Sequence, residues 1–301
     1  MSAIHPLISP EALAHLAQSS GDRLRIVDCS HDLGQSALGR QQYEQGHIPG
    51  AVHAHLDCDL SGPTTGTNGR HPLPSPEALC DWLGRQGITP EMTVVAYDRS
   101  GAMYAARLWW MLRWIGHAQA RVLDGGYAAW TAAGLPTEAG SAAPAPANYP
   151  AASADERLAV DAAFVLRNLQ TREAVLVDAR GAGRYAGEGE TIDPVGGHIP
   201  GALNRPFTDN LGEGGRFKSA TTLRAEWQAV AGAPLQAHLQ GSANPGGPRA
   251  GLVMQCGSGV TACHNLLALE SAGLGGARLY PGSWSEWCSD RSRPIVTGLQ
   301  P

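Results

Sequence analysis

The amino-acid sequence predicts an α/β protein built from two similar domains, each a mainly parallel sheet flanked by helices. Short apolar runs alternate with helical stretches along the chain, which is typical of a parallel sheet. The hexapeptide "GHIPGA" occurs at residues 46–51 and again, letter for letter, at residues 197–202, an offset of 197 − 46 = 151 residues. A chain of 301 residues is long for one domain. Duplication of one α/β domain explains all of these features.

The repeat extends beyond the hexapeptide. Three further pairs of segments occur in the same order in both halves: "RIVDCS" and "VLVDAR", "TVVAYDRSGAMYAARL" and "GLVMQCGSGVTACHNL", "ARVLDGGYAAW" and "ARLYPGSWSEW". Between the halves, "AGSAAPAPANYPAAS" lacks periodicity and is rich in alanine and proline, which favours a semi-rigid linker. We therefore expect an N-terminal domain at residues 1–138, a linker at 139–153 and a C-terminal domain at 154–301.

The elements follow from hydrophobic periodicity. Buried strands are predicted at residues 174–177, 252–255 and 278–280, and helices within "SPEALCDWLGRQG", "AMYAARLWWMLRWIG" and "VTACHNLLALESAG". Ser75, followed by Pro76, is the expected N-cap of the first of these helices, and Gly87 ends it. The glycine-rich residues 241–251 are expected to form a flexible surface loop before the strand at 252–255.

Composition excludes several classes of function. The formal net charge is −5 and the basic residues are scattered, so we expect no nucleic-acid partner. No apolar stretch approaches the roughly 20 residues of a membrane span, and the first residues lack the pattern of a secretory signal. The 6 cysteines form no CxxC pair, which favours reduced thiols and a cytoplasmic location.

Metal binding is not predicted either. His47, His53, His55 and His71 fall in the same part of the sequence, but their spacing fits neither one helix face nor a zinc finger. We therefore expect no metal and no cofactor.

Cys256 is the candidate nucleophile. It follows a predicted strand, and active sites of parallel sheets lie beyond the carboxyl ends of strands. Gly257 and Gly259 permit a tight turn whose N–H groups point at the sulfur, and a helix beginning near Thr261 adds the positive end of its dipole. Both effects stabilise a thiolate. The alternative is a buried structural cysteine, but the matching position of the first half holds Asp98, so only the second half has a reactive residue to offer.

The segments "CGSGVTA", "GHIPGA", "DAR…RYAGE" and "GSWSEW…PIVTG" together resemble those of tandem-domain rhodanese-type sulfurtransferases, over essentially the whole chain. The resemblance implies two rhodanese-like domains, of which the C-terminal one is catalytic. The uncharged loop after Cys256 is most similar to that of 3-mercaptopyruvate sulfurtransferases, because thiosulfate sulfurtransferases of this family typically have arginine and lysine there.

The resemblance also implies a mechanism. Cys256 would take sulfur from a small anionic donor and pass it to a thiol or cyanide, with thioredoxin among the candidate acceptors. The persulfide would lie in a cradle formed by Gly257, Gly259, Val260, Thr261 and Ala262.

Three further residues would assist with 3-mercaptopyruvate as donor. Ser258, His71 and Asp57 would relay a proton to the leaving enolate. The alternative is that His71 is a surface-loop histidine and Asp57 a turn residue.

Arg184 matches the family position that grips the anionic group of the donor, where a guanidinium pairs well with a carboxylate. The alternative is a surface arginine. Arg180 is expected to brace the domain. Mercaptopyruvate enzymes usually have a second arginine before the second "GHIPG", but residues 187–201 contain no arginine or lysine and are acidic instead. Thiosulfate therefore remains the alternative donor.

Two other functions compete with sulfur transfer. A cysteine phosphatase requires an arginine that closes the loop around the phosphoryl oxygens, and Thr261, Ala262 and Cys263 stand there instead, which argues against it. A persulfide carrier without turnover is the second alternative. Turnover with a small acceptor would separate a carrier from a catalyst. Cys263 is expected to be a packed helix residue.

Overall fold

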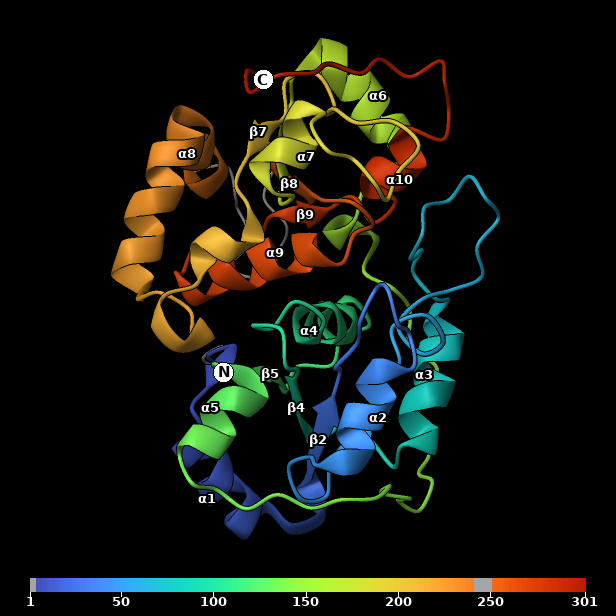
Figure 1. Ribbon diagram of the computed structural model, residues 1–301, viewed down its shortest axis with the longest axis vertical. Coiled ribbons are helices and arrows are strands. Elements are labelled where there is room, and N and C mark those ends of the chain that lie inside the picture. The colour runs from blue at the N-terminus through green and yellow to red at the C-terminus, as the bar shows by residue number, and fades with distance from the viewer. Residues whose placement is uncertain (1–3, 241–250) are drawn as a thin grey trace. The chain divides into compact units, whose positions relative to one another are not determined.

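A computed structural model describes residues 4–240 and 251–301 (Figure 1). Nearly all of the expected surface loop at 241–251 therefore lies outside the described residues. The chain forms two compact units. The N-terminal unit comprises Met1–Gly62, Leu73–Asp155 and Gly212–Phe217, and the C-terminal unit comprises Pro63–Pro72, Glu156–Leu211 and Lys218–Pro301. The linker at residues 139–153 stays a prediction, but each half contributes a short segment to the other unit.

The N-terminal unit contains a parallel sheet with the strand order β1-β5-β4-β2-β3. Its strands are β1 (Leu7–Ile8), β2 (Leu24–Asp28), β3 (Val52–His53), β4 (Thr93–Tyr97) and β5 (Ala120–Leu123). Its helices are α1 (Pro10–Ser20), α2 (Leu38–Gln45), α3 (Pro76–Arg85), α4 (Ala105–Trp114) and α5 (Gly126–Ala132), with short 3₁₀ turns at Gly21–Arg23 and Glu213–Gly215. The Ser75 hydroxyl accepts from the Ala78 N–H at 3.2 Å, which confirms the predicted N-cap of α3.

The C-terminal unit repeats this arrangement. Its parallel sheet has the order β7-β6-β8-β9, which matches β3-β2-β4-β5 of the first unit. The strands are β6 (Val175–Asp178), β7 (Leu203–Asn204), β8 (Leu252–Gln255) and β9 (Arg278–Leu279). The helices are α6 (Ala162–Thr171), α7 (Ala182–Ala186), α8 (Ala220–Gln240), α9 (Thr261–Ser271) and α10 (Ser283–Trp287), with 3₁₀ turns at Glu156–Leu158 and Phe207–Asn210. The predicted duplication of a parallel α/β domain is confirmed.

The repeated hexapeptide has a structural role in both units. In the first, His47 stacks on Tyr43 with ring centroids 4.1 Å apart, and the Tyr43 hydroxyl donates to the carbonyl of Ala51 at 2.7 Å. In the second, His198 stacks on Tyr185 at 3.7 Å in the same way. All of these rings are buried, so "GHIPGA" recurs because each copy packs a histidine and a turn against a tyrosine.

The second copy differs from the first between this tyrosine and histidine. His47 follows Tyr43 by 47 − 43 = 4 residues, whereas His198 follows Tyr185 by 198 − 185 = 13 residues. The 13 − 4 = 9 additional residues form a loop after α7, and this loop contains Glu190 and Asp193. The insertion therefore adds Glu190 and Asp193 to the second unit at a place where the first unit has no corresponding residues.

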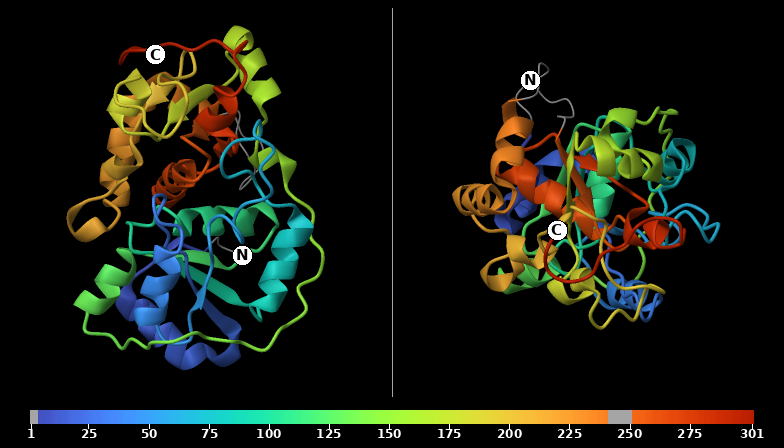
Figure 2. Two further views of the ribbon diagram at one scale, coloured as in Figure 1. Left: turned by 45° about the vertical axis from the view of Figure 1, so that its right-hand side comes forward. Right: turned by 90° about the horizontal axis from the view of Figure 1, so that it is seen from above.

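Each unit has its own apolar core. Figure 2 turns the molecule so that the helices around both sheets can be followed. Trp284 and Trp287 of α10 are completely buried in the core of the C-terminal unit, together with Val253 of β8. These large side chains hold α10 against the strand that precedes Cys256. Among the described residues, no helix is both long and apolar enough to cross a membrane.

Candidate active site

Cys256 lies directly after β8, at the carboxyl end of the parallel sheet. The residue is only 1% exposed. Its N–H donates to the Ser283 hydroxyl at 3.0 Å, and its carbonyl accepts from the Trp284 N–H at 2.9 Å. Two bonds to α10 therefore fix the backbone of the candidate nucleophile, and the predicted strand, cysteine and helix follow one another as expected.

Gly259 shapes the loop between Cys256 and α9. Its φ is +77°, a left-handed conformation that favours glycine. A Cβ atom at this position would lie 2.2 Å from the carbonyl oxygen of Pro281, which is backbone and cannot move aside easily. The loop is held on its other side by the Ser285 N–H, which donates to the carbonyl of Gly257 at 2.9 Å. Only glycine fits at Gly259, because the loop turns back tightly against the chain before α10.

The first unit shows what such a loop does to an anion. Asp98 replaces the cysteine there and is completely buried. Its two carboxylate oxygens accept four backbone N–H groups, from Ser100 at 2.8 Å, Ala102 at 2.9 Å, Tyr104 at 2.8 Å and Ala105 at 2.9 Å. Burial raises the pKa of the Asp98 carboxyl, and these four donors counteract that effect.

The ungapped match between the two loops carries this pattern to the second unit. Ser100, Ala102, Tyr104 and Ala105 correspond to Ser258, Val260, Ala262 and Cys263. The Cys263 N–H donates to the carbonyl of Val260 at 3.1 Å, so we expect the N–H groups of Ser258, Val260 and Ala262 to stabilise the negative charge of a thiolate or persulfide on Cys256. The predicted cradle of Gly257, Gly259, Val260, Thr261 and Ala262 overlaps this set, and its role stays a prediction. The Cys263 thiol itself points back and donates to the carbonyl of Gly259 at 3.3 Å, as a packed helix residue would.

Ser258 has a histidine partner. Its hydroxyl lies 2.8 Å from the Nδ1 of His71, and both residues are 7% exposed. His71 belongs to the short segment Pro63–Pro72 that is part of the C-terminal unit. The Arg70 N–H donates to the Ser285 hydroxyl at 3.1 Å, which anchors this segment beside the start of α10. The contact brings together two of the three residues that the resemblance places in a proton relay.

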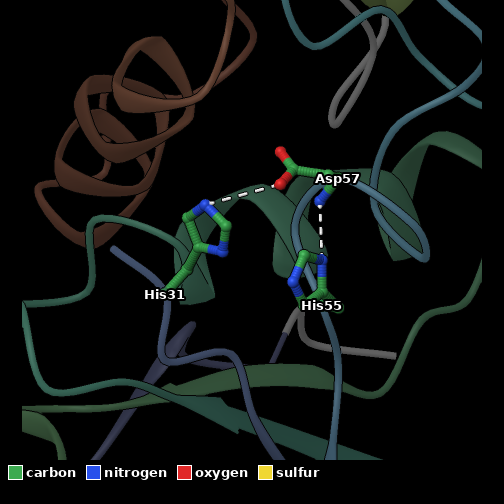
Figure 3. A group of neighbouring side chains, drawn as sticks. All are labelled: His31, His55 and Asp57. Atoms are coloured by element: carbon green, nitrogen blue, oxygen red, sulfur yellow. Dashed lines mark hydrogen bonds and ion pairs between the residues drawn. The ribbon is translucent and has the colours of Figure 1, made fainter. Parts of the chain in front are cut away.

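The third relay residue, Asp57, is in the N-terminal unit, in a group with His31 and His55 (Figure 3). The Asp57 carboxylate lies 3.9 Å from Nε2 of His31, and the Asp57 N–H donates to Nδ1 of His55 at 3.2 Å. The other ring nitrogen of His55 lies 3.1 Å from the carbonyl oxygen of Ser36. Because both nitrogens of His55 already have hydrogen-bond partners, a metal ion here would have to break one of those bonds.

Arg184 lies beside the loop after Cys256, and so does a second arginine that the sequence analysis missed. A Cβ atom at Gly257 would lie 3.5 Å from Nη1 of Arg184 and 2.9 Å from Nη2 of Arg70. Residues 187–201 contain no arginine, and the second guanidinium beside Gly257 belongs to Arg70, which precedes Gly257 by 257 − 70 = 187 residues. The available signal was its position directly before His71 in "GRHPLP". A second guanidinium therefore lies beside Gly257, although the segment where the family usually has it contains none.

Two carboxylates hold these arginines. Glu190 accepts from Nε of Arg184 at 2.9 Å and from its Nη2 at 3.0 Å. Asp193 accepts from the same Nη2 at 2.9 Å and from Nη1 of Arg70, so it bridges the two guanidiniums. Burial acts to raise the pKa of Glu190, but the hydrogen bond from Arg184 holds it below its ordinary value. Burial raises the pKa of Asp193, against the pull of Arg70.

Arg180 has the bracing role expected of it. Its Nη2 donates to the Asp178 carboxylate at 2.6 Å and to the carbonyl of Gly197 at 2.7 Å, and its guanidinium stacks on Trp284 at 4.6 Å. Burial acts to lower the pKa of Arg180, yet the paired Asp178 holds it above its ordinary value. Arg180 therefore ties β6, the second "GHIPGA" turn and α10 together.

The fold and this site define a class: two similar parallel α/β domains, of which one has a cysteine at the end of a strand where the other has a carboxylate held by backbone N–H groups. The rhodanese-like domain family matches residues 9–133 and 161–290. The chain therefore belongs to the rhodanese-like family and contains two copies of its domain.

Some relatives are named for 3-mercaptopyruvate and others for thiosulfate. The chain is 42% identical to a probable 3-mercaptopyruvate sulfurtransferase of Pseudomonas aeruginosa, over 99% of this chain and 100% of that protein. It is 36% identical to a thiosulfate sulfurtransferase of Cricetulus griseus, over 93% and 91% of the two chains. Among solved structures, 3-mercaptopyruvate sulfurtransferase from Leishmania major is similar with a TM-score of 0.79 and 34% identity, covering 95% of this chain and 75% of that one.

Proposed function

We propose that the protein is a sulfurtransferase that moves sulfur from 3-mercaptopyruvate to a thiophilic acceptor through a persulfide on Cys256. One observation supports this most strongly: the loop after Cys256 contains a serine that is bonded to a histidine, and two arginines lie beside it. His71 lies 2.8 Å from the Ser258 hydroxyl, and Arg70 and Arg184 both face Gly257. Nucleophile, proton source and anion receptor are therefore combined around one loop.

In the first step, the Cys256 thiolate attacks the sulfur of the donor. The carbon–sulfur bond of 3-mercaptopyruvate breaks, and its electron pair passes to the carbon fragment as an enolate, which takes up a proton to give pyruvate. The Ser258 hydroxyl is the proton donor in this proposal, and His71 returns a proton to it. Asp57 is the third member of this relay in the proposal, as the resemblance implies. Arg70 and Arg184 bind the carboxylate of the donor.

In the second step, an acceptor removes the outer sulfur from the persulfide. A thiolate or cyanide attacks that sulfur, the sulfur–sulfur bond breaks, and Cys256 is released as a thiolate. Ping-pong kinetics follow from this division. Thiols and cyanide are the acceptor class of this proposal, with thioredoxin as one candidate. A protein that keeps its persulfide without turnover would be a carrier, which is the second candidate function.

The Ser258–His71 pair favours 3-mercaptopyruvate over thiosulfate. Sulfite leaves thiosulfate as a stable anion and needs no proton, whereas an enolate needs one. A buried serine hydroxyl bonded to a buried histidine would therefore serve only the first donor.

Intact mass spectrometry after brief exposure to each donor tests the proposal. The native protein should gain one sulfur atom and Cys256→Ser none. Cys58→Ser, which removes an exposed thiol, is the matched control and should load normally. Ser258→Ala should slow loading from 3-mercaptopyruvate by about 100-fold, the lower end of general acid catalysis, and leave thiosulfate loading nearly unchanged.

Three results would change the conclusion. If neither donor adds sulfur to the native protein, the sulfurtransferase proposal fails. Sulfur that is added but never passed to cyanide or a small thiol makes the protein a carrier. Equal slowing of both donors by Ser258→Ala removes the reason for preferring 3-mercaptopyruvate.

A further inference from the structure

The charges around the donor site cancel. Arg70 and Arg184 provide two positive charges, and Glu190 and Asp193 provide two negative ones within hydrogen-bond distance of them. Arg180 and Asp178 add one positive and one negative charge to the same cluster, because Nη1 of Arg180 also lies 3.9 Å from the Glu190 carboxylate. Residues 257–262 of the loop have no charged side chain. The donor therefore meets two guanidiniums whose charge the protein has already neutralised.

Asp193 stands out among these groups. Its side chain is only 2% exposed, and it is the carboxylate that touches both donor-facing arginines. It comes from the loop in which the second copy is 13 − 4 = 9 residues longer than the first between its tyrosine and histidine. Nη2 of Arg184 lies 3.7 Å from a Cβ position at Gly257 and 2.9 Å from Asp193, so the Asp193 carboxylate is at most 3.7 + 2.9 = 6.6 Å from that point.

We propose that Asp193 determines donor selectivity by its charge, because it lowers the affinity of the site for dianionic donors more than for monoanionic ones. This inference rests on the proposed sulfur transfer and names its substrate class: a donor with a single negative charge, such as 3-mercaptopyruvate. Thiosulfate has two negative charges, and the second finds no free positive charge among the described groups at the loop.

Coulomb's law sets the size of the effect. One additional unit of charge about 6 to 7 Å away, at an effective dielectric constant of about 20, weakens binding by about tenfold to a hundredfold. Solvent reaches Arg70 and Arg184, whose side chains are 28% and 27% exposed, so screening favours the lower value. Removal of the Asp193 charge should therefore shift selectivity towards thiosulfate by about tenfold.

The experiment compares Asp193→Asn with the native protein, using the second-order rate constants of sulfur loading from the two donors. The ratio of the constant for 3-mercaptopyruvate to that for thiosulfate should fall about tenfold. Asp193→Glu keeps the charge and should keep the native ratio. Glu173→Gln is the remote control, because it removes an exposed carboxylate just before β6, at the opposite end of the sheet from Cys256.

A binding measurement separates this inference from the proposed function. In a Cys256→Ser background no sulfur can be transferred, so calorimetry with pyruvate and with thiosulfate reports charge selectivity alone. Asp193→Asn should strengthen the binding of thiosulfate relative to the binding of pyruvate. If Asp193→Asn lowers the affinity for both ligands equally, or the loading rate constants of both donors equally, Asp193 only supports the two arginines. The inference would then be wrong. Failure of the native protein to load sulfur would overturn the proposed function, while the calorimetry would still decide the role of Asp193.

Discussion

Arg70 is the residue whose proposed role depends most on the tertiary structure, and Arg70→Met tests it. Methionine keeps an unbranched apolar side chain of similar length and removes the guanidinium. The backbone anchor of this position, from the Arg70 N–H to the Ser285 hydroxyl at 3.1 Å, does not involve the side chain. Asp193 loses one partner but keeps Arg184 at 2.9 Å. We therefore expect the fold to be retained.

The expected loss follows from the bond that Arg70 would make to the donor. A hydrogen bond to a charged partner contributes about 1.5 to 3 kcal/mol. The second-order rate constant for sulfur loading from 3-mercaptopyruvate should therefore fall by about 10- to 150-fold. Rapid-quench mixing followed by intact mass spectrometry measures this constant directly. Arg85→Met, which removes an exposed arginine at the end of α3, is the matched control and should load as the native protein does.

One outcome would refute the reasoning about Arg70. If Arg70→Met loads sulfur within about threefold of the native protein while Arg184→Met is strongly impaired, one guanidinium is sufficient for the donor. The position of Arg70 beside Gly257 would then serve only the packing of the loop.

Two further predictions concern stability. Asp98→Asn should lower the free energy of unfolding by about 2 to 5 kcal/mol, because the amide nitrogen leaves two of the four N–H donors without an acceptor. Urea denaturation measures this free energy. A change under 1 kcal/mol would contradict the stabilising role of the four N–H donors around Asp98. Burial lowers the pKa of His53 from 6.5 to about 4, so its neutral form stabilises the fold above pH 6.5, and this stability is lost as pH falls towards 4. The pKa difference of 6.5 − 4 = 2.5 corresponds to about 3 kcal/mol of folding stability. His53→Gln should therefore reduce the change in the free energy of unfolding between pH 6.5 and pH 4. An unchanged pH dependence would assign the effect to other groups.

The sequence by itself determined the duplicated α/β fold and the position of the nucleophile. Strand β8, Cys256 and helix α9 lie where the pattern predicted them, because strand and helix periodicity and the glycines of a tight turn are local properties of the chain. The recurrence of "GHIPGA" was also visible, but its reason was not. Only the structure shows that the hexapeptide packs a histidine on a tyrosine in each unit.

The surroundings of Cys256 were decided by the tertiary structure. His71 and Ser258 are 187 residues apart in the chain, and no periodicity relates Arg70 to Arg184. The resemblance named His71, but it gave no reason to consider Arg70 and could not show that Asp193 bridges both guanidiniums. Contacts of this kind form when segments far apart in the sequence pack together within one unit, and their energies depend on distance and burial, which a linear sequence does not contain.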